Sequence, residues 1–403
     1  MKKIHLLFVV LIVFFAKTNA SEISQAIKFQ TQEITAAEYV NSLVLNNGML
    51  LGKKLAVKNA ESQVNQMSAP VINPSVTISK GAYYGQTPYT PFVSPASDTF
   101  TFGGVWEGFG KRAAREEYAK AELVRTQSEM EFSKRAITGD AIFAYLDTLR
   151  TKLAWKSYQD GVIRLSAIGD KDTKERVQSI QTTVANDFKF FSFALNNFVG
   201  RSSNTLFEPM GNVANVLPKE FKVDELVSNA MKSRADVLNF EDALKSADAS
   251  IKLTEKNRNI DLMPSIWTSR TPSYTAGGNR YDPSVAYGVS LTIPIPVNLL
   301  QDNDRIQAAN NKVSLEINFQ DLRSKILTEI NQSFLLYDSA KQKYGSALAA
   351  YEEAKQKKND KTVDGITTFL DREIEFNDAK INHAKSQIYL LRVSGFYDLP
   401  NLE

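Results

Sequence analysis

The sequence predicts a mostly α-helical secreted protein with a small β part, built from two structural repeats. Two windows, 96–208 and 297–399, contain no proline, which is typical of long uninterrupted helices. Each window follows a stretch rich in proline, glycine and aromatic residues in which polar and apolar residues alternate, and this alternation indicates β-strands. The two copies lie about 190 residues apart. Long helices that follow a small β part in each of two repeats favour a conduit over an enzyme.

The first twenty residues have the composition of an export signal. Lys2 and Lys3 precede an apolar run over 6–15, and the small residues of 18–20 precede Ser21. We therefore expect residues 1–20 to be a secretory signal peptide that is removed. The alternative, a membrane anchor, would need about 20 apolar residues.

The composition of the remaining chain excludes several classes of function. It holds 45 basic and 45 acidic residues, so net charge gives no support to nucleic-acid binding. It has no cysteine and one histidine, His383. Thiol chemistry, Ser-His-Asp triads and transition-metal cages cannot be assembled from such a set, and no cofactor is expected.

The first repeat is predicted over 21–205. It contains a helix over 35–68, a strand pair near 72–79 and 98–109, and a long helical hairpin over 111–199. The first helix of that hairpin, 111–168, would span roughly 87 Å at about 1.5 Å per residue. Asp170 and Asp172 stand at the tip, where the chain turns back.

An irregular link over 206–221 separates the repeats, and the second repeat is predicted over 222–403. It contains a helix over 223–258, a strand pair near 263–270 and 284–294, and a helical hairpin over 302–395 that breaks near Asp364-Gly365.

Small polar residues form one face of the predicted strands. The opposite, apolar face is formed by Phe100, Phe102, Trp106, Val285, Tyr287, Val289, Leu291 and Ile293. We expect lipid on the apolar face and a wet lumen on the other. The alternative is a small soluble sheet packed on its own core. Because natural barrels need about eight strands, four strands would close a pore only with strands from other copies.

The second hairpin carries a heptad pattern. Ile330, Tyr337, Tyr344 and Tyr351 recur at seven-residue steps, which indicates helices packed side by side. An ordinary coiled-coil dimer would also explain this pattern, but it leaves the strands and the signal peptide unexplained.

Three passages give the chain a family resemblance: 233–238 with its continuation to 265, 289–296, and 365–371. In this order and spacing the sequence resembles the TolC-type outer-membrane efflux proteins over essentially the whole mature chain. The passage 108–115 (Gly-Phe-Gly-Lys-Arg-Ala-Ala-Arg) resembles the heavy-metal cation branch of that family.

The resemblance implies a homotrimer whose protomers each give four strands to a 12-stranded outer-membrane β-barrel, continued by a long α-helical barrel. It implies a passive exit duct for efflux or secretion in the outer membrane of a Gram-negative bacterium, extending into the periplasm. It also implies partners, namely a periplasmic adaptor and an inner-membrane pump.

The resemblance further assigns a gate to the second hairpin, at Asp371 with Asp364 and Gly365. Three copies of one carboxylate around a narrow axis would attract cations. The family's second acidic position is Ile374 here. The simpler interpretation of Asp371 is a solvated acid near a helix N-terminus, where the helix dipole favours it.

The hairpin tips are candidate contacts for the adaptor or pump, through Asp170, Asp172, Lys357, Lys358 and Lys361. Charges at helix ends are also favourable without any partner. Tyrosines near the strand loops are candidates for an interfacial belt: Tyr83, Tyr84, Tyr89, Tyr274 and Tyr281.

Two other functions remain open. A periplasmic adaptor would have one helical hairpin flanked by β-domain halves, whereas this sequence predicts two hairpins and two strand pairs. A secreted enzyme could use paired carboxylates, although the sequence shows no such pair clearly.

Overall fold

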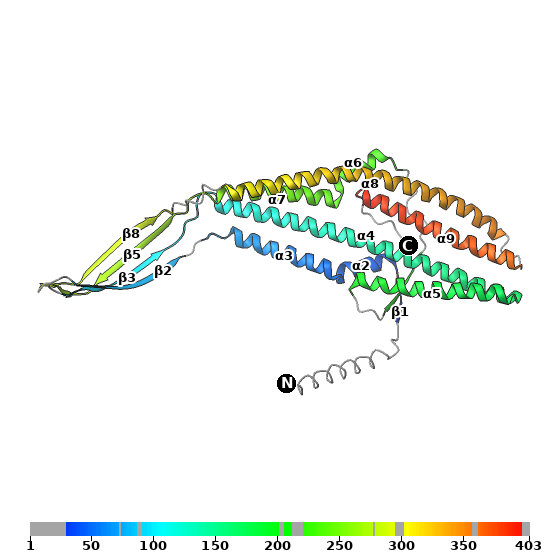
Figure 1. Cartoon of the computed structure of the whole chain (residues 1–403), viewed down its shortest axis with the longest axis horizontal. Coiled ribbons are helices and arrows are strands. Elements are labelled where there is room, and N and C mark those ends of the chain that lie inside the picture. The colour runs from blue at the N-terminus through cyan, green and yellow to red at the C-terminus, as the bar shows by residue number, and fades with distance from the viewer. Residues whose placement is uncertain are drawn as a thin grey trace, which may run out of the picture. The chain divides into compact units, whose positions relative to one another are not determined.

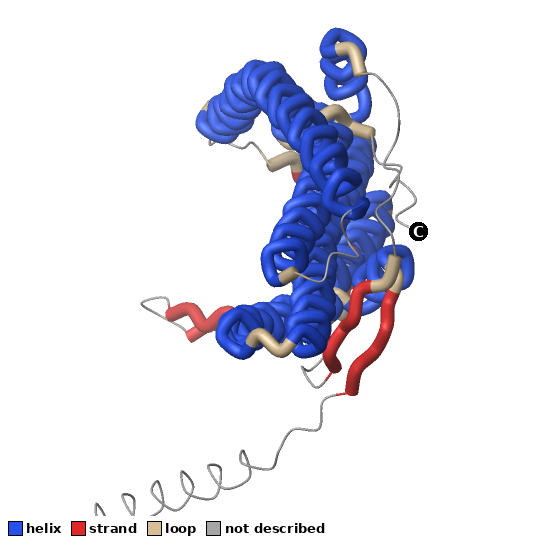
Figure 2. The backbone as a smooth tube through the Cα atoms, turned by 90° about the vertical axis from the view of Figure 1, so that its right-hand side faces the viewer, coloured by secondary structure: helices blue, strands red, loops and turns tan. Residues whose placement is uncertain are grey.

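The structure is a computed structural model that describes residues 30–71, 74–86, 91–200, 205–211, 221–276, 279–294, 302–356 and 362–396. The predicted signal peptide, Tyr89, Lys357, Lys358 and Lys361 lie outside the described residues. Helices make up most of the fold (Figure 2), which confirms the predicted class. In the described part of the chain, no helix is both long and apolar enough to cross a membrane.

The order of elements is nearly the same in the two halves of the chain (Figure 1). The first half contains β1 (Gln30–Ile34), α2 (Ala36–Asn46), α3 (Gly48–Ser68), β2 (Ser75–Gln86), β3 (Pro91–Gly103), α4 (Lys111–Ile168) and α5 (Lys171–Val199). The second contains β4 (Thr205–Pro209), α6 (Val223–Ser233), α7 (Ala235–Lys256), β5 (Met263–Thr271), β6 (Tyr274–Ala276), β7 (Asn279–Tyr281), β8 (Ser284–Thr292), α8 (Asn303–Gln356) and α9 (Val363–Val393).

The long helix α4 has the bounds that the sequence predicts, but the short strands were missed. β1 and β4 pair in parallel, with Gln30 opposite Thr205, so the interpretation of 206–221 as wholly irregular is wrong at its start. Neither strand has a clear alternating pattern, and the pairing joins distant parts of the sequence. The short hairpin β6–β7 is likewise absent from the predicted strands.

Two helices predicted as continuous are broken by polar residues. Asn47 separates α2 from α3 because its Oδ1 accepts the backbone N–H groups of Met49 and Leu50, and its Nδ2 donates to the carbonyl of Phe198. Arg234, with extended backbone, separates α6 from α7. Asparagine is a preferred helix N-cap because its side chain satisfies the first backbone donors.

The predicted break at Asp364-Gly365 is wrong by a few residues. α9 already begins at Val363, and the hydroxyl of Thr362 caps it by accepting the N–H of Gly365. Asp364 and Gly365 therefore lie in the first helical turn, where an acid is favourable.

The chain forms two compact units. The first comprises Met1–Gly52, Glu131–Ala235 and Arg323–Glu403, and the second Lys53–Met130 and Asp236–Leu322. Each unit takes segments from both halves of the sequence, because the long helices run through both units.

The core of the first unit forms where the β1–β4 pair meets α2, α4 and α5. Tyr39, Tyr145 and Phe207 are almost fully buried there, and the ring of Tyr39 contacts both of the others. Such aromatic pairs contribute beyond their buried area. The rings thus fix the strand pair against the helices.

Side chains of α4 and α5 also hold β4 by hydrogen bonds to its backbone. Ser192 Oγ donates to the carbonyl of Phe207 at 2.6 Å, and Lys152 Nζ donates to the carbonyl of Pro209 at 2.8 Å. The Tyr145 hydroxyl lies 3.0 Å from the carbonyl oxygen of Ile34 and accepts the N–H of Met210 at 3.0 Å. Burial raises the pKa of Tyr145 to about 12.

The variant Tyr145→Phe tests this arrangement. It leaves the carbonyl of Met210 without the hydroxyl that donates to it, while the N–H of Met210 keeps its bond to the carbonyl of Ile34, and we expect the free energy of unfolding to fall by about 1–3 kcal/mol. The thermal midpoint followed by circular dichroism measures the change. Tyr118→Phe is the matched control, because the half-buried Tyr118 hydroxyl makes no hydrogen bond with the described residues. Equal midpoints for the two variants would contradict the assignment.

Candidate channel-forming surfaces

The second unit holds a four-stranded antiparallel sheet in the order β2-β3-β5-β8 (Figure 1). β2 and β8 are its edges, and the outer side of each has no partner among the described strands. Unpaired edges expose backbone donors and acceptors that readily pair with another strand. The sheet is therefore open to pairing on both sides.

One face of this sheet is apolar and exposed. Aligned across the strands are Val76, Phe102, Ile266 and Val289, and in the next row Ile78, Phe100, Thr268 and Tyr287. The apolar side chains of these rows are 44% to 85% exposed. No described residue covers this face as a core would, which disfavours a small soluble sheet. Large exposed apolar patches mark membrane or protein contacts.

The predicted face residues of β8 lie on this same side, including Val285 and Leu291. Two of the candidates lie just outside the strands: Ile293 follows β8, and Trp106 follows β3. Trp106 nevertheless pairs with Leu262 in an isolated bridge that keeps the register of β3 with β5. Trp106 therefore continues the face of Phe100 and Phe102.

The opposite face carries small polar residues. Its rows are Ser75, Gly103, Ser265 and Ser290, then Thr77, Thr101, Trp267 and Gly288, then Ser79, Thr99, Ser269 and Ala286. Hydroxyl pairs join neighbouring strands, Thr99 with Ser269 at 3.0 Å and Ser265 with Ser290 at 2.6 Å. The face suits contact with water.

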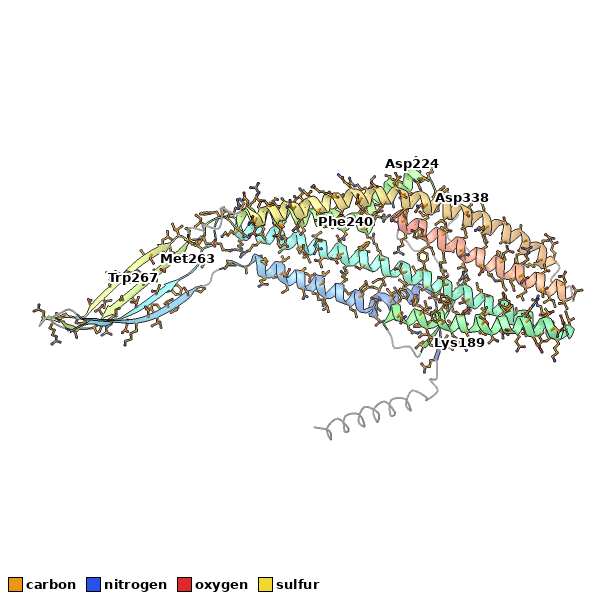
Figure 3. The ribbon with its side chains drawn as sticks, viewed as in Figure 1. Lys189, Asp224, Phe240, Met263, Trp267 and Asp338 are labelled. Carbon is orange, nitrogen blue, oxygen red and sulfur yellow. The ribbon has the colours of Figure 1, made fainter. Side chains whose placement is uncertain are left out.

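Trp267 of β5 (Figure 3) brings a large aromatic side chain to this polar face, as the register with Thr101 shows. Its ring lies over Gly288, where an added Cβ would be 2.7 Å from a ring carbon. Contacts under 3 Å force a side chain to move, so the ring needs glycine at this position. The sequence showed both residues but not that they are neighbours.

The variant Gly288→Ala should displace the Trp267 ring. With Trp106 and Trp155 replaced by Phe, we expect the Trp267 fluorescence to shift to longer wavelength as the ring becomes more exposed. Gly81→Ala is the control, since a Cβ at that strand glycine meets nothing within 4 Å. An unchanged spectrum for Gly288→Ala would show that the ring does not lie there.

In the first unit, aromatic rings form a continuous stack between α8 and α9. Tyr337, Tyr344 and Tyr351 of α8 alternate with His383, Phe376 and Phe369 of α9, with ring centroids 4.8 to 5.9 Å apart. Both sets recur at seven-residue steps. The predicted heptad is thus the seam of an antiparallel hairpin. Burial, with a smaller effect of Lys341, lowers the pKa of His383, so the ring is neutral near pH 7.

α9 also packs antiparallel to α4 through ion pairs at heptad spacing. Lys385 binds Asp147 at 2.9 Å and Arg392 binds Asp140 at 2.8 Å. One and two heptads nearer the tip, the same positions of α9 are Asp378 and Asp371. The sequence interpretation missed these α4 partners, although their spacing was visible.

Asp371 is exposed and makes no hydrogen bond or ion pair with the described residues. Tyr158 of α4 lies near both Asp371 and Asp378, since burial and then these two carboxylates raise the pKa of its hydroxyl. Ile374 packs against Leu165, Val177, Ile366 and Leu370. An acid at position 374 would enter this apolar cluster, so the apolar side chain of Ile374 suits its surroundings.

Asp378 is the half-buried carboxyl of this α9 row. Burial raises its pKa, and nearby Arg150 opposes the shift. A raised pKa means that this group favours the folded state most at acid pH, and the contribution is lost as the pH rises through the folded-state pKa.

We therefore expect Asp378→Asn to raise the thermal midpoint at pH 7, because the amide carries no charge to desolvate. The gain should shrink as the pH falls toward the ordinary carboxyl pKa of about 3.9. Asp321→Asn, which changes an exposed carboxylate of α8, is the control. A lower midpoint for Asp378→Asn at pH 7 would contradict this account.

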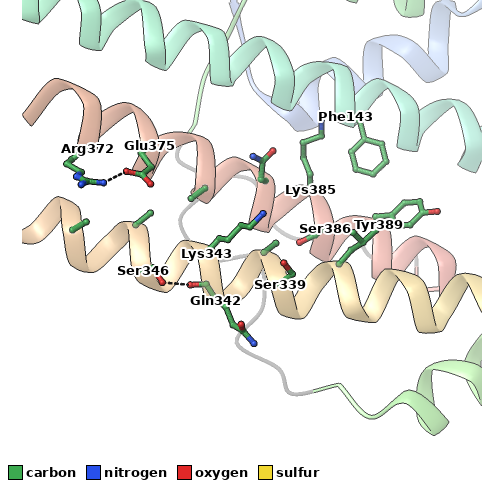
Figure 4. Close-up of a pocket in the computed structure, with 16 residues that line it drawn as sticks. Phe143, Ser339, Gln342, Lys343, Ser346, Arg372, Glu375, Lys385, Ser386 and Tyr389 are labelled. Atoms are coloured by element: carbon green, nitrogen blue, oxygen red, sulfur yellow. Dashed lines mark hydrogen bonds and ion pairs between the residues drawn. The ribbon is translucent and has the colours of Figure 1, made fainter. Parts of the chain in front are cut away.

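A groove of about 1240 Å³ runs along α8 and α9 (Figure 4). Small residues of α8 line one wall: Ser339, Ala340, Ser346, Ala347 and Ala350. Arg372 pairs with Glu375 on α9, and Lys343 reaches into the groove from α8. Small side chains allow another helix to approach closely.

The remaining predicted tip residues, Asp170 and Asp172, lie at the start of α5. Asp170 precedes α5 without capping it by a side-chain bond, and Asp172 is exposed in its first turn. The described residues contain no group of three or more His, Cys, Asp and Glu side chains that could hold a metal.

The passage 233–238 has a structural role. Arg234 binds Glu329 of α8 at 2.8 Å and the carbonyl of Val393 at 3.2 Å. Ser233 donates to the carbonyl of Asn229 and contacts the backbone of Gly395. This passage joins α6, α8 and the end of α9 within the first unit.

Comparison with solved structures assigns the fold. A membrane protein from Pseudomonas aeruginosa matches with a TM-score of 0.65 and 15% identity, covering 89% of this chain and 93% of its own. The open-state MtrE outer membrane channel of Neisseria gonorrhoeae matches with a TM-score of 0.62 and 13% identity, covering 89% of this chain and 88% of its own. The chain has the fold of outer-membrane channels. The CmeC outer membrane channel of Campylobacter jejuni also matches, with a TM-score of 0.61 and 15% identity, covering 89% of this chain and 85% of its own.

The predicted resemblance to TolC-type proteins is confirmed at the level of this fold. No protein-family model matches the sequence, and no curated protein matches it significantly. The solved structures share the fold at a sequence identity of only 13% to 15%.

Proposed function

We propose that this protein is the outer-membrane channel of a tripartite efflux or secretion system, a passive duct that performs no chemistry. The observation that carries the proposal is the sheet of β2, β3, β5 and β8, with an exposed apolar face, a small polar face and two open edges. Lipid suits the first face and a water-filled lumen the second. The fold shared with outer-membrane channels supports the same function.

The open edges support assembly from several copies. Pairing β8 of one copy with β2 of the next satisfies both edges, and three copies would give the twelve strands expected from the resemblance. We propose a homotrimer in the outer membrane of a Gram-negative bacterium, with the long helices extending into the periplasm.

We further propose that the hairpin tips meet a periplasmic adaptor and an inner-membrane pump. Asp170 and Asp172 are exposed or half-buried at the first tip, where charged side chains are accessible to a partner. The groove of α8 and α9 offers a second surface for a helix of the adaptor. The heavy-metal branch remains a prediction from 108–115.

The gate is proposed at Asp371, with Asp364 and Gly365 in the first turns of α9. Asp371 can face an axis because it is exposed and makes no hydrogen bond or ion pair with the described residues. Three exposed carboxylates around an axis would favour cations over anions.

Planar bilayer recordings test the duct and the gate together. We expect the purified protein to form cation-selective channels, and Asp371→Asn to lower the cation-to-anion permeability ratio because it removes the charged ring. Asp321→Asn is the matched control and should leave the ratio unchanged.

Two results would contradict the proposals separately. Unchanged selectivity in Asp371→Asn would remove Asp371 from the gate but leave the duct intact. A protein that stays in the soluble periplasmic fraction and forms no channels would contradict the duct itself and favour an adaptor.

A further inference from the structure

A hollow of about 650 Å³ lies where the sheet joins the helices of the second unit. Its walls are mainly apolar and include Val71, Val105, Trp106, Phe109 and Pro264. Trp106 is 67% exposed and Phe109 is 80% exposed. Two large aromatic side chains thus stand open to the surroundings at the rim of an apolar hollow.

The hollow opens on the apolar side of the sheet. Trp106 keeps the register of β3 with β5 through its bridge to Leu262, so its side chain continues the face of Phe102. The backbone N–H of Trp106 donates to the carbonyl of Leu262 at 2.6 Å, which holds the backbone of Trp106 in place. The hollow is therefore continuous with the surface proposed to meet lipid.

Among the charged side chains around this hollow, Arg112 is the one that is not neutralised by an ion pair with the described residues. Glu107 is neutralised by Arg115 at 2.8 Å, and Lys111 by Asp261 at 2.9 Å. Arg112 lines the hollow and makes no ion pair with the described residues. Its neighbour Glu116, which also experiences the charge of Arg112, is paired with Lys120 at 2.7 Å.

The side chain of Arg112 is held in place while its terminal groups stay open. Its Nε donates to the carbonyl of Ser68 at 2.6 Å, whereas its two terminal nitrogens make no hydrogen bond with the described residues. A guanidinium fork with open donors matches an anionic oxygen pair, such as that of a phosphate.

The local backbone is built to hold this arrangement. Gly108 packs against the backbone of Ile260, where an added Cβ would be 2.6 Å from the carbonyl oxygen, and its N–H donates to Asp261 at 2.7 Å. Gly110 has a φ of +84°, which favours glycine. The glycines of 108–115 thus set the position of Phe109 and Arg112, which explains this passage without reference to a metal.

We propose that this hollow binds one phospholipid, with its phosphate group on Arg112 and the start of an acyl chain between Trp106 and Phe109. The site rests on the proposed function, since it requires the apolar face of the sheet to lie in a bilayer. An apolar hollow with one open cation at its rim fits an amphiphile with an anionic head. Interfacial tryptophan is favourable at the same depth.

Quenching by brominated lipid tests the proposal. The full chain, with Trp155 and Trp267 replaced by Phe, is kept in mild detergent and titrated with phosphatidylglycerol that carries brominated acyl chains. We expect saturable quenching of Trp106. Arg112→Gln should bind about tenfold more weakly, because it loses a charge-assisted hydrogen bond.

Two further variants keep the test decisive. Phe109→Ala removes an exposed wall of the hollow and should also weaken binding, without the Ser68 contact being touched. Arg176→Gln, which changes an exposed arginine of α5 with no partner among the described residues, should bind like the parent protein.

Quenching that rises linearly with lipid and is equal in Arg112→Gln would overturn the site, while the channel function would stand. A protein that does not enter detergent micelles and remains soluble without them would overturn both.

Discussion

The structure depends on one physical constraint, which is that the sheet of β2, β3, β5 and β8 cannot satisfy itself within one chain. Its apolar face is exposed, and its two edges lack partners among the described strands. Exposed apolar surface costs about 25 cal/mol per Å² relative to burial, and open edges invite pairing. Lipid on the face and other copies at the edges remove both costs.

The helical part solves a different problem, because its long helices need contacts along their length. In the first unit these contacts repeat at seven-residue steps, as rings between α8 and α9 and as ion pairs between α4 and α9. The repeat changes character toward the tip, where Asp371 is exposed and Asp378 is half-buried beside Arg150. The seam is stable along most of its length and less well matched near the proposed gate.

Much of the fold could be predicted from the sequence because the signals are local and repeated. The absence of proline over 96–208 predicted long helices there, and alternation placed β5 and β8. β1 and β4 could not be predicted, since they are stabilised by pairing with each other and by side chains such as Tyr145 and Ser192. The break at Asn47 likewise depends on a contact with Phe198.

The candidate site was predicted less completely. The apolar face was visible because its residues alternate, and the tyrosines of α8 were visible because they recur. Their partners Phe369, Phe376 and His383 have the same spacing, so the signal was present but was not used. The pairing of Trp267 with Gly288 and the open fork of Arg112 depend on neighbours from other strands and helices, which no local pattern shows.

The central claim is that the edges of the sheet pair between copies, and disulfide cross-linking tests it most directly. β2 and β8 of one chain are separated by β3 and β5, so they lie about 14 Å apart at about 4.8 Å per strand. Cysteines pair only when their Cα atoms are within about 7 Å. The natural chain has no cysteine, so Thr77→Cys can be combined in turn with Ser284→Cys, Ala286→Cys and Ser290→Cys. We predict that at least one pair gives covalent dimers and trimers on a denaturing gel after mild oxidation. Monomers with free thiols in every pair would contradict the account.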